Sequence, residues 1–552
     1  MLDPGLSSLS LEKSPFRKGG LVGKDVQALI FSLDPGNRTP AVSSAKARWT
    51  TCPSRVYTEG PVSTVRLSPQ DEEFFDLVAR ATFCNPFSDE RVELDLKIAR
   101  CPPSLTVDER VERVSHKIRE RVGKLEERGL ADLRRYGGEA LERMRSAFLF
   151  EIFHRFLEQL DELLMVQMRA GDAPCPVPFA REALGLLRRR GFAAEESLRF
   201  FAMFYQARRA FYFVDRALVG QSPSMKQLRL RLWNNVFTHD IRWYEKYLWD
   251  RMEDFSTLIL GETGTGKGTA AAAIGRSGFI PFDPARGVFA ESFMRTFITI
   301  NLSLYPESLI ESELFGHRKG AFTGAIEHHQ GAFARCSPHG SVFLDEIGDV
   351  SLPVQVKLLQ VLQERTFSPV GSHERHRFHG RVIAATNRNL EELRGKGLFR
   401  DDFYYRLCSD IIVAPPLRRR LRENPRELET MLRHVIGRMT GEGAPELVER
   451  VREALRDRPG PDYSWPGNVR ELEQAVRRIL LTRAYGGDGC REASGLAERL
   501  HRGLENGNLQ ARHLLQGYCA LLYGRLGSYE AVARRTGLDR RTVKKYVAEP
   551  IP

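Results

Sequence analysis

The fold is decided by the stretch Thr257-Leu258-Ile259-Leu260-Gly261-Glu262-Thr263-Gly264-Thr265-Gly266-Lys267. Its first four residues predict a short buried strand, and the helical pattern after Lys267 completes a strand–loop–helix unit. Glycines in such a loop let backbone N–H groups turn toward phosphate oxygens, while the lysine and the helix N-terminus add positive charge. The stretch therefore predicts an α/β domain that binds a nucleotide, with ATP as the expected cofactor.

The residue after Lys267 departs from the general phosphate-loop pattern. Gly268 stands where that pattern has Ser or Thr to contact magnesium. A glycine in the first helical turn costs about 0.5–1 kcal/mol relative to alanine. Thr269 carries the next hydroxyl along the chain. The predicted cofactor-binding segment therefore runs from Gly261 through Gly268 and Thr269.

Five short apolar runs separated by helical stretches predict a parallel sheet covered on both faces. They are Thr257–Leu260, Phe297–Ile300, Ser341–Leu344, Arg381–Ala384 and Asp410–Ala414. Most of them end at polar residues, among them Asn301, Asp345 and Asn387. Ligands of open parallel sheets bind beyond the carboxyl ends of the strands, so we expect these side chains to converge on one crevice.

Two adjacent acids, Asp345 and Glu346, follow the apolar run Ser341–Leu344. Carboxylates at the end of a buried strand are costly to desolvate unless a cation accompanies them. The simplest interpretation assigns Asp345 to Mg²⁺ and Glu346 to the water that attacks the γ-phosphate.

A second loop lies between the phosphate loop and the acidic strand, Gly320-Ala321-Phe322-Thr323-Gly324-Ala325. The segments Glu313–His317 before it and Gly331–Phe333 after it complete the pattern. Together they resemble the bacterial enhancer-binding proteins, which are AAA+ ATPases that remodel RNA polymerase carrying sigma-54. The resemblance extends from about Val219 to Tyr485 and resumes in the last thirty residues. It implies that residues 320–325 contact sigma-54, and we expect a mobile loop between Gly320 and Gly324 that exposes Phe322 and Thr323.

The resemblance also implies roles for residues outside the phosphate loop. Asn301 matches the asparagine that holds the catalytic glutamate inactive, and Asn387 matches the first sensor of the γ-phosphate. Arg400 and Arg406 match the arginines that reach the ATP of a neighbouring subunit. Arg470, in Trp465–Leu472, matches the second sensor. Because arginine fingers act in trans, the family pattern implies a ring, expected to be a hexamer.

Three stretches differ from the family pattern. The segment between Ala270 and Phe297 is longer than usual and contains several prolines and glycines, and Gln227–Asp254 is longer and rich in aromatic residues. After Pro415-Pro416-Leu417-Arg418, the segment Arg419–Asn424 replaces the usual Glu-Arg-x-x-Asp-Ile run, which bears on how the sheet connects to the helical subdomain.

The central domain is flanked by two regions of different character. Residues 1–68 are rich in Ser, Pro and Gly, with one predicted strand at Val26–Leu33, and are expected to be irregular. Residues 69–217 carry helical periodicity and form an expected regulatory domain. They lack the pattern of a phosphorelay receiver, so the input is left open between a small molecule, a partner protein and no regulation. Phe200–Phe213 places seven aromatic residues in fourteen, a pattern more typical of a core or dimer interface than of a ligand pocket.

The C-terminal part predicts a DNA-binding unit. We expect the α/β subdomain at 218–417, a helical subdomain at 418–485, a linker at 486–507 and a Fis-type helix-turn-helix at 508–552. Gly537 permits a left-handed turn and Asp539 caps the second helix. Between Arg525 and Val547 there are seven basic and two acidic residues. The expected DNA contacts are Arg540, Arg541, Thr542, Lys544 and Lys545.

Composition is consistent with this organisation. The 552-residue chain has a formal net charge of +12, which favours a polyanionic partner, and its eight cysteines contain no C-x-x-C pair. No signal pattern or membrane-spanning run is present in the sequence, so we expect a cytoplasmic protein without a membrane partner. The predicted function is a sigma-54-dependent activator that binds upstream double-stranded DNA. The alternatives are an AAA+ remodeller of another client and a DNA-binding regulator with a vestigial ATPase.

Overall fold

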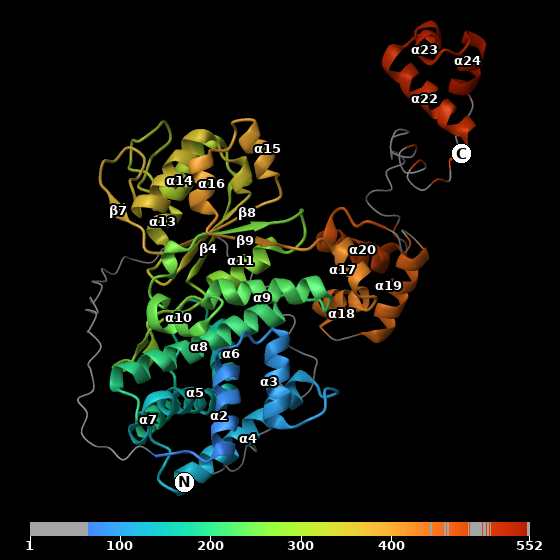
Figure 1. Ribbon diagram of the computed structural model, residues 1–552. Helices are drawn as coiled ribbons and strands as arrows, with labels where there is room; N and C mark the ends of the chain where they lie inside the picture. The colour runs from blue at the N-terminus through green and yellow to red at the C-terminus, as the bar shows by residue number, and fades with distance from the viewer. Residues whose placement is uncertain are drawn as a thin grey trace, which may run out of the picture. The chain divides into compact units, whose positions relative to one another are not determined.

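The computed structural model describes residues 65–548, with gaps at 442–443, 458–459, 461–462, 484, 486–499, 501–503, 505–506 and 508 (Figure 1). The strand predicted at Val26–Leu33 lies outside the described residues. The chain divides into two compact units. One comprises Met1–Val448 with Asn468–Arg470, and the other comprises Glu449–Gly467 with Glu471–Pro552.

The first unit contains the predicted five-stranded parallel sheet. Its order is β4-β5-β8-β1-β9, with bounds Phe297–Asn301, Ser341–Asp345, Arg381–Thr386, Thr257–Leu260 and Asp410–Val413. The five runs read from the sequence are these five strands. Strand β1 pairs with β8 in the register Leu260↔Thr386, and β4 pairs with β5 in the register Asn301↔Asp345. The polar strand ends therefore lie along one edge of the sheet, as expected.

Helices cover the sheet on both faces. One group comprises α9 (Pro223–Phe237) and α11 (Lys267–Gly275), and the other comprises α12 (Glu307–Phe315), α13 (Ala332–Arg335), α14 (Leu352–Glu364), α15 (Leu390–Gly395) and α16 (Asp401–Leu407) (Figure 1). Strand side chains alternate between two clusters: Leu258, Leu344 and Val382 belong to one, and Ile259, Phe343 and Ile383 to the other. Burial on both faces explains why the strands read as continuous apolar runs.

Residues 69–216 are helical, as predicted. The helices are α2 (Pro69–Phe83), α3 (Asp89–Ala99), α4 (Val107–Glu127), α5 (Gly138–Arg155), α6 (Leu157–Ala170), α7 (Ala180–Arg189) and α8 (Ala194–Arg216), with a 3₁₀ turn at Leu133–Arg135. Helix α4 begins at a capping box between Thr106 and Glu109. The apolar spacing of Val107, Val111, Val114, Ile118, Val122 and Leu125 predicts one buried face, and the last four are buried, whereas Val111 is only partly buried and Val107, in the first turn, is 55% exposed.

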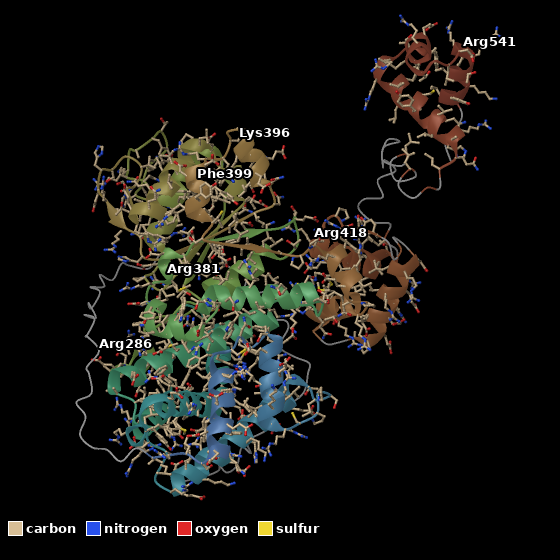
Figure 2. All side chains as sticks on the ribbon, viewed as in Figure 1. Arg286, Arg381, Lys396, Phe399, Arg418 and Arg541 are labelled. Atoms are coloured by element: carbon tan, nitrogen blue, oxygen red, sulfur yellow. The ribbon has the colours of Figure 1, made fainter. Side chains whose placement is uncertain are left out.

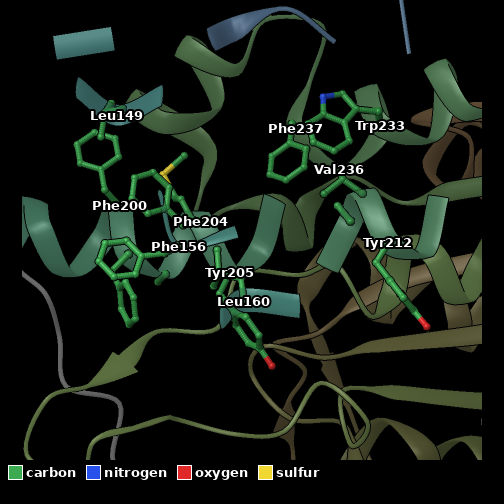
Figure 3. Close-up of a cluster of buried hydrophobic side chains, with 14 of the residues drawn as sticks. Leu149, Phe156, Leu160, Phe200, Phe204, Tyr205, Tyr212, Trp233, Val236 and Phe237 are labelled. Atoms are coloured by element: carbon green, nitrogen blue, oxygen red, sulfur yellow. The ribbon is translucent and has the colours of Figure 1, made fainter. Parts of the chain in front are cut away.

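The aromatic stripe of α8 belongs to the core. Phe200, Phe204 and Tyr205 are buried beside Phe156, which separates α5 from α6, and Leu160 of α6 (Figure 3). This core is continuous with that of the sheet, since the same buried cluster contains Ile259 of β1 and the alanines of α11. The helical region and the α/β domain therefore pack as one body rather than as separate domains.

The long segment after α11 forms a small hairpin. Strands β2 (Phe282–Asp283) and β3 (Val288–Phe289) pair antiparallel, with Phe282 opposite Phe289. Phe201 of α8 makes edge contact with Phe282 at 5.0 Å between ring centroids, and Tyr205 stacks on Phe289 at 4.0 Å. The extra length relative to the family pattern is therefore the surface on which α8 packs.

The other aromatic insertion contains α10 (Ile241–Trp243), the π-helical turn η3 (Tyr244–Leu248) and η4 (Met252–Asp254). Trp233 and Tyr244 are buried, whereas Trp243 and Tyr247 are each 57% exposed. A further two-stranded pair, β6 (Thr366–Phe367) with β7 (His376–Arg377), follows α14.

The connection beyond the sheet is a helix despite its unusual sequence. Helix α17 (Leu417–Glu423) leads into α18 (Glu427–Thr440). Arg420 is buried and donates to Glu427 at 2.8 Å and to the Val219 carbonyl at 2.6 Å. Glu427 also accepts from the backbone N–H groups of Gln221 and Ser222. The two charges are thus paired and hydrogen-bonded, which makes their burial tolerable.

Helices α19 (Pro445–Asp457) and α20 (Asn468–Thr482) follow, and the C-terminal helices are α22 (Ala511–Leu526), α23 (Tyr529–Thr536) and α24 (Arg540–Ala548). The last three share a small core of Cys519, Val532 and Val543. Within the described part of the chain, no helix has the length and hydropathy required to span a membrane.

Candidate functional site

The phosphate loop adopts the conformation that its glycines permit. Gly264 and Gly266 have φ angles of 79° and 93°, in the left-handed region that favours glycine. The Thr265 hydroxyl donates to the Glu262 carbonyl at 2.8 Å and holds the turn. Lys267 begins α11, and its Nζ donates to the carbonyls of Gly261 (2.9 Å) and Glu262 (3.3 Å). The lysine side chain is thereby folded back over the phosphate loop.

The two acids lie at the end of β5, opposite this lysine. Burial raises the pKa of Asp345, and the neighbouring Glu346 charge raises it further. Burial lowers the pKa of Lys267, while the two carboxylates oppose that shift. In this half-buried site the two carboxylates repel each other, and a divalent cation would relieve that repulsion. The desolvated ammonium of Lys267 would in turn be stabilised by the negative charge of a phosphate chain.

Glu346 is held in an unusual backbone conformation. Its φ of 56° is left-handed, which costs a non-glycine residue about 1–3 kcal/mol and is concentrated at functional positions. Its Oε2 accepts from the backbone N–H of Asn387 at 3.2 Å, and the Asn387 side chain donates to Thr263 Oγ1 at 2.8 Å. Asn387 therefore links the catalytic candidate to the phosphate loop.

Asn301 lies next to Asp345 in register but has different partners. Its Oδ1 accepts from the N–H and hydroxyl of Ser303, at 3.1 and 2.8 Å, and so caps the turn Leu302–Leu304. Glu346 is instead bonded to Asn387. The switching role that the resemblance implies for Asn301 stays a prediction.

Two further residues contact the phosphate loop and were missed in the sequence. Arg418 forms a bidentate ion pair with Glu262, with Nη1–Oε2 at 2.7 Å, which lowers the pKa of that carboxyl (Figure 2 labels Arg418). Asn468 donates to Glu262 and to the Thr263 carbonyl, and accepts from Leu417 N–H. In the sequence, Arg418 was marked only by its position two residues after Pro416, and Asn468 only by its position two residues before Arg470.

The three arginines implied by the resemblance have different surroundings. Arg470 is exposed. Burial and the charges of nearby side chains have the larger effects on the pKa values of Lys267 and Asp345, and the charge of Arg470 lowers both pKa values to a smaller extent. Within one chain, Arg400 pairs with Asp402 at 2.7 Å, and Arg406 Nε donates to the Leu362 carbonyl at 3.0 Å. Their action on a neighbouring subunit stays a prediction.

The loop at residues 320–325 is a compact hairpin tip. The bridge between His317 and His329 closes its base through two 3.0 Å hydrogen bonds, and Gly320 N–H donates to the Ala325 carbonyl at 2.8 Å. Gly320 and Gly324 have φ angles of 82° and 103°. Phe322, expected to be exposed, is half-buried against His317 with ring centroids 4.9 Å apart, whereas Thr323 is exposed. The difference arises because the hairpin folds back on its own base.

Helices α23 and α24 lie where the C-terminal sequence predicts them. Gly537 is left-handed with φ of 71°, and Asp539 Oδ1 accepts from the N–H groups of Arg541 and Thr542 at 3.0 and 3.1 Å. Val543 is fully buried and Leu538 partly so. Arg540, Arg541, Lys544 and Lys545 are exposed on α24, with Arg541 labelled in Figure 2 and Arg540 paired with Glu530.

A parallel sheet of order β4-β5-β8-β1-β9 with a phosphate loop after β1 and an acidic end to β5 defines a P-loop domain of the AAA+ class. Residues 243–412 match the family model of the sigma-54 interaction domain. The central part of the chain is therefore a sigma-54 interaction domain, in agreement with the resemblance carried by residues 313–333.

The chain is similar to several transcription regulators. The chain is 39% identical over 262 residues to the DNA-binding transcriptional regulator NtrC of Azospirillum brasilense, covering 48% of this chain and 47% of NtrC. It is 38% identical over 275 residues to the Nif-specific regulatory protein of Azotobacter vinelandii, covering 49% and 45%. It is 42% identical over 244 residues to the Sigma54-dependent transcriptional activator SfnR of Pseudomonas putida, covering 44% and 60%. The matched part spans about half the length of these relatives.

Proposed function

We propose that the chain is a sigma-54-dependent transcription activator that hydrolyses ATP in a ring and thereby opens promoters held by sigma-54 RNA polymerase. The observation that carries the proposal is the hairpin at residues 320–325, inside a sigma-54 interaction domain whose phosphate loop and acidic strand end are intact. A nucleotide site alone would bind ATP without indicating what is moved.

The chemistry assigned to the nucleotide site follows from its charges. Lys267 and the N-terminus of α11 bind the β- and γ-phosphates, and Asn387 senses the γ-phosphate. Asp345 is the residue that would hold Mg²⁺, which supplies positive charge against the phosphate oxygens when bound. Glu346, fixed by the Asn387 N–H, orients and deprotonates the attacking water. Thr265 and Gly266 keep the loop in its phosphate-binding shape.

Completion of the site requires a second copy of the chain. Arg400 and Arg406 lie on or beside α16, paired with Asp402 and the Leu362 carbonyl. In a ring, they would release these partners and contact the γ-phosphate of the adjacent subunit, where a guanidinium stabilises transferring-phosphoryl charge. A hexamer is the proposed assembly, and Arg470 completes the nucleotide contacts from the same subunit.

The 320–325 hairpin is the proposed contact with sigma-54. Its glycines give the backbone freedom to change conformation, and Phe322 must leave His317 to meet a partner. Helix α24 is the proposed DNA-recognition element, since its exposed basic residues suit phosphates and the edges of base pairs. Upstream DNA would then hold the ring near the promoter.

Two assays on the unmodified protein distinguish this proposal from its alternatives. We expect the purified chain to hydrolyse ATP and to form open complexes with sigma-54 polymerase on a sigma-54 promoter. A regulator with a vestigial ATPase predicts no hydrolysis above background. A remodeller of another client predicts hydrolysis but no open complex. Either of the last two results would contradict the proposed function.

DNA binding is tested by removing the C-terminal helices. Deleting residues 526–552 should abolish protection of a double-stranded site that the full chain has selected from a random pool, while ATP hydrolysis stays measurable. Arg541→Ala should weaken binding about 5- to 150-fold, because a base-contacting arginine contributes about 1–3 kcal/mol. Footprinting and titration at fixed salt measure both effects.

The matched control is Arg525→Ala, which removes an equally exposed arginine from the end of α22. Its binding should change much less than that of Arg541→Ala. Equal losses in the two variants would indicate general charge attraction rather than recognition by α24. An unchanged footprint after the deletion would move the DNA site to another part of the chain.

A further inference from the structure

Helix α11 connects the phosphate site to the helical region 69–216. It begins at Lys267 and ends at Gly275, so that one rigid element about 13 Å long joins the phosphate lysine to residues 276–278. Ala270, Ala271, Ala272 and Ala273 are all buried along it. Alanine side chains have no rotamers with which to absorb a displacement. A shift at the C-terminal end of α11 therefore moves Lys267 as well.

Helix α8 holds that C-terminal end through three carbonyls. Arg209 donates from Nη1 to the Arg276 carbonyl and from Nη2 to the Gly278 carbonyl, both at 2.7 Å. Gln206 Nε2 donates to the Ser277 carbonyl at 2.9 Å and is itself fixed by the Tyr244 hydroxyl. These are carbonyls at and just beyond the end of α11, where the helix dipole favours a positive charge.

Arg209 makes its hydrogen bonds to these carbonyls. It is fully buried and forms no ion pair with a carboxylate among the described residues, although the charge of Glu291 acts on it. Its guanidinium lies instead over the rings of Tyr205 (4.6 Å) and Phe293 (5.7 Å). Burial lowers the pKa of Arg209 to about 10, which leaves it charged at neutral pH. A buried cation that forms no direct ion pair depends on its carbonyl partners, so the hydrogen bonds of Arg209 fix the carbonyls of Arg276 and Gly278 relative to α8.

A second set of contacts holds the segment after α11 to the same region. Phe282 and Phe289 of the hairpin pack on Phe201 and Tyr205, as described above. Val177 N–H also donates to the Gly287 carbonyl at 3.0 Å, and the Ser292 hydroxyl donates to the Gly171 carbonyl at 2.6 Å. The helical region therefore contacts both the C-terminal end of α11 and the hairpin segment that follows it.

We propose that Arg209 and Gln206 are positioning residues for the nucleotide site, through which the helical region 69–216 sets nucleotide affinity by fixing the end of α11. The inference rests on the proposed binding of ATP at Lys267. Any input to the helical region that moves α8 would change nucleotide affinity without touching the nucleotide. By linkage, a bound nucleotide must stabilise the α8–α11 contact to the same extent.

The test compares two adjacent arginines of α8 in the full chain. Arg209→Met removes the contact with α11, whereas the control Arg208→Met removes a bidentate ion pair with Asp161 inside the helical region. With ADP as the probe, Arg209→Met should raise the dissociation constant at least fivefold, and Arg208→Met should leave it within twofold. In turnover, Arg209→Met should raise KM for ATP and change kcat less. Partial unfolding alone would lower kcat and leave KM unchanged.

Hydrogen exchange supplies the reciprocal measurement. ADP should slow exchange in residues 194–216 of the unmodified chain and of Arg208→Met, but not of Arg209→Met. If Arg209→Met does not fold, Gln206→Met takes its place as the test variant. It retains the buried Arg209 cation and should raise the dissociation constant for ADP about threefold. The inference is overturned if the folded variant binds ADP like the unmodified chain, or if Arg208→Met is equally impaired. Failure of the unmodified chain to bind either nucleotide would overturn the proposed function instead.

Discussion

Replacing Lys267 by alanine should abolish ATP binding at micromolar concentrations, whereas Glu346→Gln should bind ATP and fail to hydrolyse it. Lys267 is the only cation that the phosphate loop itself supplies. Removing one partner of a buried charge pair costs about 2–5 kcal/mol, or roughly a 30- to 4,000-fold loss of affinity. Calorimetric titration with ATP and with ADP measures the loss.

Glu346→Gln separates binding from chemistry. An amide retains the shape of the side chain and accepts the Asn387 N–H bond, but it does not take a proton from water. Loss of a positioned general base reduces turnover about 10²- to 10⁴-fold. Phosphate release should therefore fall by that factor while the dissociation constant for ATP stays within a few-fold. Unchanged turnover in this variant would contradict the assignment of Glu346.

The matched control for Lys267 is Lys396→Ala. Lys396, labelled in Figure 2, is exposed and paired with Glu392 at the C-terminal end of α15, outside the phosphate loop. The Lys396→Ala variant removes the same charge from the protein as Lys267→Ala does, without changing the phosphate site. Thermal unfolding of the two variants distinguishes a lost ligand contact from a lost fold. Because burial already lowers the pKa of Lys267, its removal should not destabilise the ligand-free protein.

Much of the α/β domain was predictable because its signals are local. Each strand is a short apolar run that ends at a polar residue, and parallel strands place those ends at one edge. The phosphate loop and the Gly537 turn were equally readable, since glycine takes up left-handed conformations without a steric cost. In each case one short segment carries its own conformational requirement.

The contacts that were missed join segments far apart in the sequence. Arg209 sits in an aromatic stripe that reads simply as core, and its partners lie 67 and 69 residues away. Strands β2 and β3 have two residues each, which is too short for a period to appear. The Arg418–Glu262 pair spans 156 residues. Such pairings depend on how segments that are distant in the sequence pack together, and no local pattern encodes them.

The state of Phe322 illustrates the same limit within a motif that was recognised. The resemblance identified residues 320–325, and the flanking glycines indicated a loop that can change conformation. The sequence did not predict that Phe322 lies against His317, because that contact depends on the backbone pairing of His317 with His329. Residues 320–325 therefore form a folded hairpin tip in which the Phe322 side chain is half-buried, rather than an open loop.

Phe322→Ala and Thr323→Ala should uncouple ATP hydrolysis from promoter opening. Neither side chain contacts the phosphate loop in the described structure, so ATP turnover should stay within about twofold of the unmodified protein. In a ring, several copies of Phe322 would meet one segment of the client, and an aromatic anchor at the centre of an interface contributes about 2 kcal/mol or more. Open complexes with sigma-54 polymerase should therefore fall below detection, measured by permanganate reactivity of the melted promoter strands.

The matched control is Ile326→Ala, just beyond the hairpin tip. Ile326 is 76% exposed and apolar, but it lies outside the six-residue pattern. If Phe322 acts through a specific contact, Ile326→Ala should open promoters normally. If the contact instead depends on the total apolar surface at this tip, the two variants should both lose promoter opening. Full promoter opening by Phe322→Ala would refute the role of the hairpin, because residues 320–325 contain no second aromatic side chain to replace Phe322.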